Sequence, residues 1–85
     1  MINVQVRLYA TLRKYRPEIP HGQSFTVKLA TGSKIRELLQ ELGIPEGETK
    51  QVFVNGIIQD AEYHLADGDS LGVFPPIAGG QRRVI

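Results

Sequence analysis

The chain has 85 residues, 41% of them hydrophobic, and a formal net charge of +1. This length suits one small domain, and this hydrophobic content excludes an intrinsically disordered chain. The absence of cysteine excludes disulfides, zinc–cysteine sites and thiol catalysis. Because the N-terminus carries no signal-peptide pattern and no apolar run approaches the roughly 18 residues of a membrane span, we expect a cytoplasmic protein with no membrane association.

The charges are distributed unevenly along the chain. Residues 1–36 carry seven Lys or Arg and one acid, whereas residues 37–80 carry eight Asp or Glu and one base. The acidic half would suit docking on a basic partner surface, or its charges are simply solvated. The basic cluster at residues 13–16 contains a single tyrosine. Nucleic-acid binding sites usually combine more basic residues with more aromatic residues. We therefore expect a solvated loop there and no nucleic-acid partner.

Two N-terminal segments, residues 2–8 and 25–29, alternate apolar and polar side chains with the period of two that is typical of half-buried strands. The connection at residues 10–22 contains prolines and reads as a loop with one helical turn around residues 12–15. We expect the two strands to form an antiparallel hairpin, because the connection between them is short.

A helix is predicted after residue 33. Ser33 is a plausible N-cap, and Gly43 followed by Pro45 is a typical helix end. Four apolar residues between these signals have helical spacing and should bury one face: Ile35, Leu38, Leu39 and Leu42.

A second hairpin is predicted over residues 52–58, because Asn55-Gly56 tolerates the positive φ values of a type I′ turn. Residues 60–66 form a polar crossing with Tyr63 and Leu65 as anchors, and residues 67–69 turn into a last strand at residues 71–74. One helix packed across one mixed sheet of four to five strands buries all these faces, which predicts an α+β fold.

An apolar patch is a further expectation for this half of the chain. Phe53 and Val54 lie on opposite faces of their strand, so one of them can be exposed. With Ile57, Ile58 and Phe74 it would form a partner-binding patch on the open sheet face, or these residues are ordinary core.

The last strand is followed by two prolines and then by two glycines. Pro75 and Pro76 lack an N–H, so strand pairing cannot continue past Phe74. Gly79 and Gly80 have no Cβ, so this extended segment can enter a slot too narrow for other residue pairs. Taken alone, such a pair is often a flexible joint.

The order of these elements resembles one known family. The hairpin motif VFVNG at residues 52–56 and the run DGDSLGVFPPIAGG at residues 67–80 are similar to the MoaD and ThiS sulfur-carrier proteins, with the proline pair closer to the molybdopterin branch. The resemblance covers residues 1–80 and implies the ubiquitin-like β-grasp fold. Residues 81–85 then form a C-terminal extension to this domain.

The resemblance also implies a chemistry. In such carriers an adenylating enzyme related to the ubiquitin-activating enzymes uses ATP to activate the final glycine, which becomes a thiocarboxylate and donates sulfur to an acceptor such as the large subunit of molybdopterin synthase. Gly80 would carry the reacting carboxylate, and the partner-binding residues would be Phe53, Phe74, Pro75, Pro76, Ile77, Ala78 and Gly79. Glycines suit this role because a side chain beside the reacting carbonyl would obstruct attack.

The sequence departs from the family pattern after Gly80. Gln81 follows, so the Gly80 carbonyl lies in a peptide bond and needs a tail-processing peptidase before it can be adenylated. Three hypotheses remain: a processed sulfur carrier, a ubiquitin-like protein modifier that joins Gly80 to a lysine, and a non-conjugating binding module.

We expect no autonomous active site. His21 and His64 lie in separate polar segments without the ligand spacing of a metal site, and no serine has a base and an acid nearby. The sequence therefore predicts a carrier or accessory subunit, not an enzyme, that binds no metal and no cofactor of its own.

Overall fold

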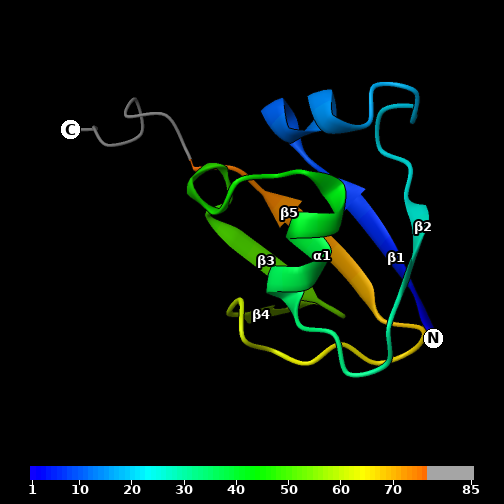
Figure 1. The fold of residues 1–85 in the computed structure, drawn as a ribbon. Helices are drawn as coiled ribbons and strands as arrows, with labels where there is room; N and C mark the ends of the chain where they lie inside the picture. The colour runs from blue at the N-terminus through cyan, green and yellow to red at the C-terminus, as the bar shows by residue number, and fades with distance from the viewer. Residues whose placement is uncertain (77–85) are drawn as a thin grey trace.

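The computed structural model describes residues 1–76; the predicted functional residues Ile77, Ala78, Gly79 and Gly80 and the extension at residues 81–85 lie outside this range. The described part contains a sheet, one α-helix and two short 3-10 helices (Figure 1). In chain order the elements are β1 (Ile2–Leu8), η1 (Ala10–Tyr15), β2 (Phe25–Leu29), α1 (Ile35–Leu42), η2 (Glu46–Glu48), β3 (Gln51–Val54), β4 (Ile57–Gln59) and β5 (Ser70–Phe74).

The five strands form one mixed sheet in the order β2-β1-β5-β3-β4. β1 and β5 pair in parallel at its centre, and all other neighbours are antiparallel. The predicted N-terminal hairpin is confirmed as β1–β2, with Val4 opposite Val27. This arrangement confirms the predicted α+β architecture of one helix on a mixed sheet, with five strands.

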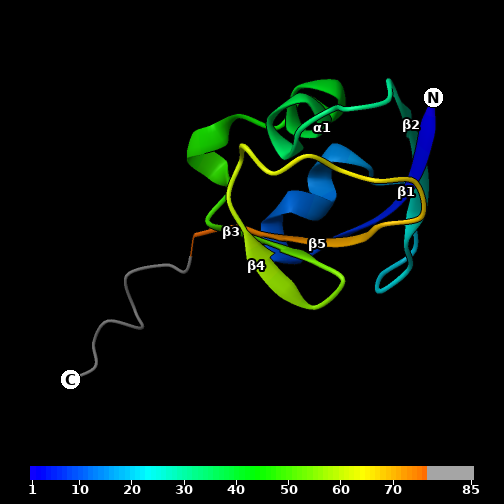
Figure 2. The same ribbon diagram turned by 90° about the horizontal axis from the view of Figure 1, so that it is seen from below.

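The core lies between α1 and one face of the sheet. Figure 2 shows α1 on one side of the sheet, while no helix of residues 1–76 covers the other side. The predicted apolar stripe of α1 is buried in full, as is Leu12 of η1 at the end of the core. Burying each such leucine or isoleucine contributes about 1.5–3 kcal/mol. None of the helices in residues 1–76 is long and apolar enough to cross a membrane.

The N-terminus of α1 differs from the prediction. The N-cap is Lys34, not Ser33, and the Lys34 backbone N–H donates to Glu37 Oε1 at 2.6 Å. The Ser33 hydroxyl donates to the Ala30 carbonyl at 2.7 Å, and the Ser33 carbonyl accepts from the Leu65 N–H at 2.8 Å. Pairing with residue 65 therefore keeps Ser33 outside the helix. The other end is as predicted, with Gly43 at φ 77°.

The segment between β4 and β5 caps α1 with its backbone. The Ile35 N–H donates to the Tyr63 carbonyl and the Arg36 N–H to the Ala61 carbonyl, both at 3.0 Å. These are N–H groups of the first helical turn, which have no partner within the helix. Leu65 is buried and Tyr63 packs against the core, so both predicted anchors are confirmed.

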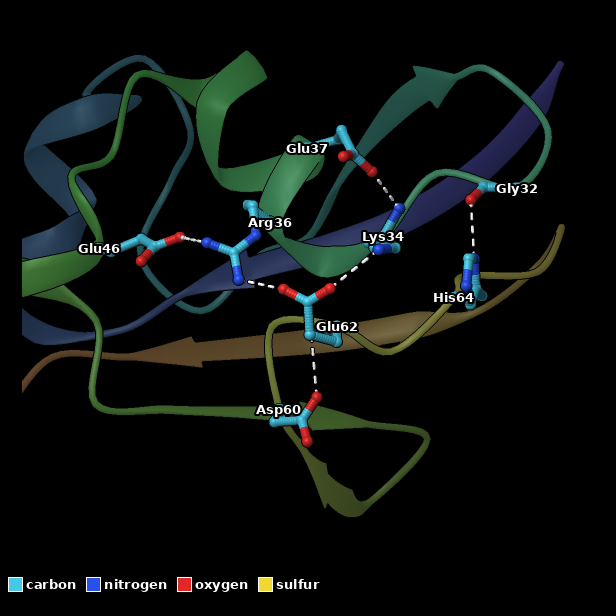
Figure 3. A network of polar contacts seen from close by, with 8 residues as sticks. All are labelled: Gly32, Lys34, Arg36, Glu37, Glu46, Asp60, Glu62 and His64. Atoms are coloured by element: carbon cyan, nitrogen blue, oxygen red, sulfur yellow. Dashed lines mark hydrogen bonds and ion pairs between the residues drawn. The ribbon is translucent and has the colours of Figure 1, made fainter.

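Side-chain charges reinforce this contact (Figure 3). Glu62 accepts from Lys34 Nζ at 2.8 Å and from the Arg36 guanidinium, which also donates to Glu46 at 2.6 Å. The hydrogen bonds from Lys34 and Arg36 lower the pKa of Glu62 to about 2. Two of the acids that make the second half of the chain negative are therefore paired with bases beside α1.

Candidate functional site

One face of the sheet is not covered by any helix of residues 1–76. Strand alternation and pairing place the following residues on it: Asn3, Gln5 and Arg7 of β1, Thr26 and Lys28 of β2, Ser70, Gly72 and Phe74 of β5, Gln51 and Phe53 of β3, and Ile58 of β4. We call this surface the open face.

Three rings gather on the open face, and we call them the aromatic cluster: Tyr9, Phe53 and Phe74. Tyr9 and Phe74 stack with ring centroids 4.2 Å apart and planes 4° from parallel. Phe53 meets Phe74 edge to face at 5.4 Å. Each such pair is worth about 0.5–1.5 kcal/mol beyond its area burial. All three rings remain partly accessible, so the cluster is an ordered apolar surface.

Gly72 permits the stack. A Cβ at this position would lie 3.1 Å from Tyr9 Cε2 and 3.4 Å from Phe74 Cε1. The Tyr9 ring therefore lies directly over the backbone of the central strand β5, and any side chain at residue 72 would displace it. A glycine in a strand interior commonly marks such a close approach.

The two predicted aromatic contacts, Phe53 and Phe74, are thus brought together, and Pro75 and Pro76 follow directly after Phe74. β5 ends at Phe74, whose carbonyl accepts the last sheet bond from the Lys50 N–H at 2.8 Å. Pro75 is half-buried and Pro76 is exposed. A groove at this point is lined by Ala10, Thr11, Lys50, Gln51, Phe74, Pro75 and Pro76. The aromatic cluster therefore lies next to the proline pair that follows β5.

The predicted apolar patch is only partly correct. Val54 is buried in the core, and Phe53 is the accessible member of that pair. Ile58 is 54% exposed and lies on the open face, since it pairs with Phe53. Ile57 is 64% exposed but pairs with Val54, so it lies on the opposite side of the sheet. One patch cannot contain both isoleucines.

The acidic half of the chain does not make this face negative. The only charged strand residues on it are Arg7 and Lys28, and none is acidic. A second groove on the open face is lined by Arg7, Tyr9, Ser24, Phe53, Asn55, Gly56, Ser70, Leu71, Gly72 and Phe74. The open face thus combines apolar rings with positive charge, because the chain's acids lie in α1, in η2 and in loops.

The sequence analysis missed Tyr9 and Gly72. Tyr9 continues the solvent-side alternation of β1, which gives its face but not the ring of β5 that it contacts. Gly72 carried a usable signal, because glycine inside a predicted strand suggests a close approach. Within residues 1–76 no group of three or more His, Asp or Glu side chains is arranged to hold a metal ion.

Comparisons with solved structures find the same fold. A protein designated molybdopterin converting factor, subunit 1, from Pyrococcus furiosus superposes with a TM-score of 0.71 at 25% identity, over 91% of this chain and 100% of that one. A chain in the complex of subunits 1 and 2 of the molybdopterin-converting factor from Helicobacter pylori gives 0.57 at 26% identity, over 93% and 100%.

SAMP1 from Haloferax volcanii gives a TM-score of 0.68 at 22% identity, over 92% of this chain and 99% of that one, a likeness of fold. A comparison with curated proteins finds no match. The family model described as Mut7-C ubiquitin matches residues 1–79. The chain thus belongs to the Mut7-C ubiquitin family and has the ubiquitin-like β-grasp fold predicted from its resemblance to the sulfur carriers.

Proposed function

We propose that this protein is a sulfur carrier for the biosynthesis of a molybdopterin-type cofactor. A peptidase hydrolyses the bond between Gly80 and Gln81, and an activating enzyme uses ATP to adenylate the new carboxylate. A sulfide-level sulfur donor then attacks the acyl carbon and displaces AMP to give a thiocarboxylate. A second enzyme, such as a molybdopterin synthase large subunit, uses this thiocarboxylate as its sulfur source. The carrier works in the cytoplasm, binds no cofactor itself and leaves catalysis to its partners.

The position of the aromatic cluster supports this proposal most directly. A carrier needs a rigid surface that holds the partner and a thin segment that reaches the partner's active site. The cluster supplies the first next to Pro75 and Pro76, where the second begins. Gly80 is the fourth residue after Pro76, so the reacting carboxylate can lie at most about 14 Å beyond Pro76. The partner's active site should lie within that reach of its contact with Phe74.

The charges of the open face indicate the kind of partner surface. Arg7 lines the groove with the aromatic cluster, and Lys28 lies further along the same face. We therefore expect an apolar partner patch with acidic residues at its rim. Such rim charges mainly increase the association rate, and their effect decreases with salt.

Binding to the activating enzyme tests the surface. Phe74→Ala should weaken the complex by about 2 kcal/mol or more, roughly 30-fold, because clustered aromatics are typical hot spots. Ile57→Ala is the control, since it removes an exposed apolar side chain from the other side of the sheet. Calorimetry of both variants, each checked for folding by circular dichroism, measures the difference. Equal losses in the two variants would exclude the open face as the docking surface.

The similarity of fold to SAMP1, a small archaeal modifier protein, supports a second candidate, a ubiquitin-like modifier. It shares the processing and activation of Gly80 and differs only in the acceptor, which is a lysine of another protein. A third, non-conjugating module would bind through the open face with its tail intact. Gly80→Ala should abolish function in the first two cases and leave the third unaffected.

The intact mass of the protein from its native cells tests the chemistry. A species that ends at Gly80, heavier by the replacement of one oxygen with sulfur, would establish processing and thiocarboxylation together. Lysine-linked conjugates of the same truncated chain would identify the modifier instead. If only the chain through Ile85 is found while the pathway is active, both conjugating functions are wrong.

A further inference from the structure

The turn between β3 and β4 is tied to the start of β5 by the side chain of Asn55. Its Nδ2 donates to Asp69 Oδ1 at 2.9 Å, and its Oδ1 accepts from the Ser70 backbone N–H at 3.0 Å. The other Asp69 oxygen accepts from the Ala66 N–H at 2.8 Å, and Asp69 is only 7% exposed. The buried Asp69 carboxylate therefore lies against the Asn55 amide. Both Asp69 oxygens and the Asn55 oxygen accept a hydrogen bond.

The residue after Asn55 makes this amide chemically labile. Gly56 has no Cβ to crowd its backbone nitrogen, which can attack Asn55 Cγ and close a five-membered succinimide. The new N–Cγ bond replaces the bond to Nδ2, which leaves as ammonia and carries away the Gly56 amide proton. Water then opens the ring to aspartate or isoaspartate. One water is consumed and one ammonia is released, with no oxidation or reduction.

We propose that Asn55 is a deamidation site that the native fold protects, and that the reaction in an opened chain blocks stable refolding. Ring closure requires the Asn55 side chain to leave both Asp69 and Ser70, so the folded turn holds the reacting carbon in place. The product puts a carboxylate oxygen where the Nδ2 donor was, 2.9 Å from Asp69 Oδ1. Two carboxylates at this distance cannot both be ionised without a large cost.

The site also lies on the docking surface. Asn55 and Gly56 line the open-face groove together with Arg7 and the aromatic cluster. Deamidation would introduce negative charge at the rim of a face whose strand residues carry none. The modified chain would therefore differ in partner binding as well as in stability; the stability argument does not depend on the proposed function.

Incubation of the full chain tests the protection. The protein is held folded or in urea at one pH and temperature, and peptide mass spectrometry follows residue 55. Asn3 is an internal control, because the β-branched Val4 that follows it hinders ring closure. In urea, we expect Asn55 to react faster than Asn3. In the folded protein, Asn55 should react at least about tenfold more slowly than it does in urea, because only locally opened molecules react. Equal rates in the two states would overturn the proposal.

Three variants test the conflict between carboxylates. Asn55→Asp mimics the product, Asn55→Ala removes the hydrogen bonds without adding charge, and Asn55→Asp combined with Asp69→Asn exchanges the two groups. In the exchange variant, the amide at position 69 donates to the carboxylate at position 55 and still accepts from the Ala66 N–H, so the network is complete again. The other charged groups nearby are Arg7, which lines the same groove, and Asp67, which accepts from the Asn3 N–H.

The measurement is the denaturant midpoint at pH 4 and pH 7. The midpoint of Asn55→Asp relative to the unmodified chain should fall as the pH rises, since a proton shared by the two carboxylates at low pH is then lost. Asn55→Ala should show a loss that does not change with pH, and the exchange variant should recover at least half of the loss at pH 7. If Asn55→Asp and the exchange variant are equally stable at pH 7, the proposal is wrong.

Discussion

The close approach of Tyr9 to Gly72 predicts that the effect of a side chain at residue 72 depends on whether the Tyr9 ring is present. In the unmodified chain, Gly72→Ala places a Cβ 3.1 Å from Tyr9 Cε2, so the ring must move and its stack on Phe74 weakens. The lost stack costs about 0.5–1.5 kcal/mol. Replacing glycine by alanine within a strand returns about 0.5–1 kcal/mol through the smaller backbone entropy of the unfolded chain. The net change should lie between about 0.5 kcal/mol of stabilisation and about 1 kcal/mol of destabilisation.

The same substitution in a Tyr9→Ala background should stabilise the protein by about 0.5–1 kcal/mol, because the obstructing ring is gone and only the entropy effect remains. Equilibrium urea unfolding of the four chains gives the interaction free energy between the two sites, which we expect to be about 0.5–1.5 kcal/mol. Phe74 is unchanged in all four chains, so its contact with the new Cβ cancels. An interaction free energy near zero would refute the conclusion that the missing Cβ of Gly72 is what allows the Tyr9 ring to lie over β5.

Further predictions concern the helix and its contacts. Leu38→Ala should lower the free energy of unfolding by about 2–5 kcal/mol with an unchanged m-value in urea, because the side chain is 0% exposed. Gly43→Ala should cost roughly 1 kcal/mol in thermal unfolding, since φ is 77° and the residue contacts nothing that a methyl would disturb. Glu62→Gln should remove a contribution that is complete above the ordinary carboxyl pKa of 4.5 and is lost as the pH falls towards about 2, where the lowered pKa of Glu62 lies. The stability difference between Glu62→Gln and the unmodified chain should therefore shrink between pH 5 and pH 2, and also at pH 7 in high salt, because the pair is exposed; a constant difference would exclude Lys34 and Arg36 as its cause.

Local patterns determined most of the fold. The period-two alternation of β1 fixed which side chains face the core, and the helical spacing of α1 did the same for its stripe. The Asn-Gly dipeptide determined the type of turn, and the structure has positive φ at both residues, 52° and 87°. Such features depend on neighbours in sequence, which is why a single chain reveals them.

The N-cap shows where local reasoning ends. Ser33 has a suitable side chain, but its carbonyl is taken by the Leu65 N–H, so the helix begins one residue later. The pairing partner lies in the segment between β4 and β5, on the far side of two strands in the sequence. A distant backbone contact therefore overrides the local preference.

The docking surface depended even more on tertiary structure. The sequence by itself identified Phe53, Phe74 and the proline pair, and it determined that two glycines follow them. Only the sheet order brought β1, β5 and β3 side by side, stacked Tyr9 on Phe74 and left these rings on a positive face. The charge imbalance along the chain could not give this result, because the sign of a surface depends on which strands become neighbours and which acids, such as Glu62, are paired beside the helix.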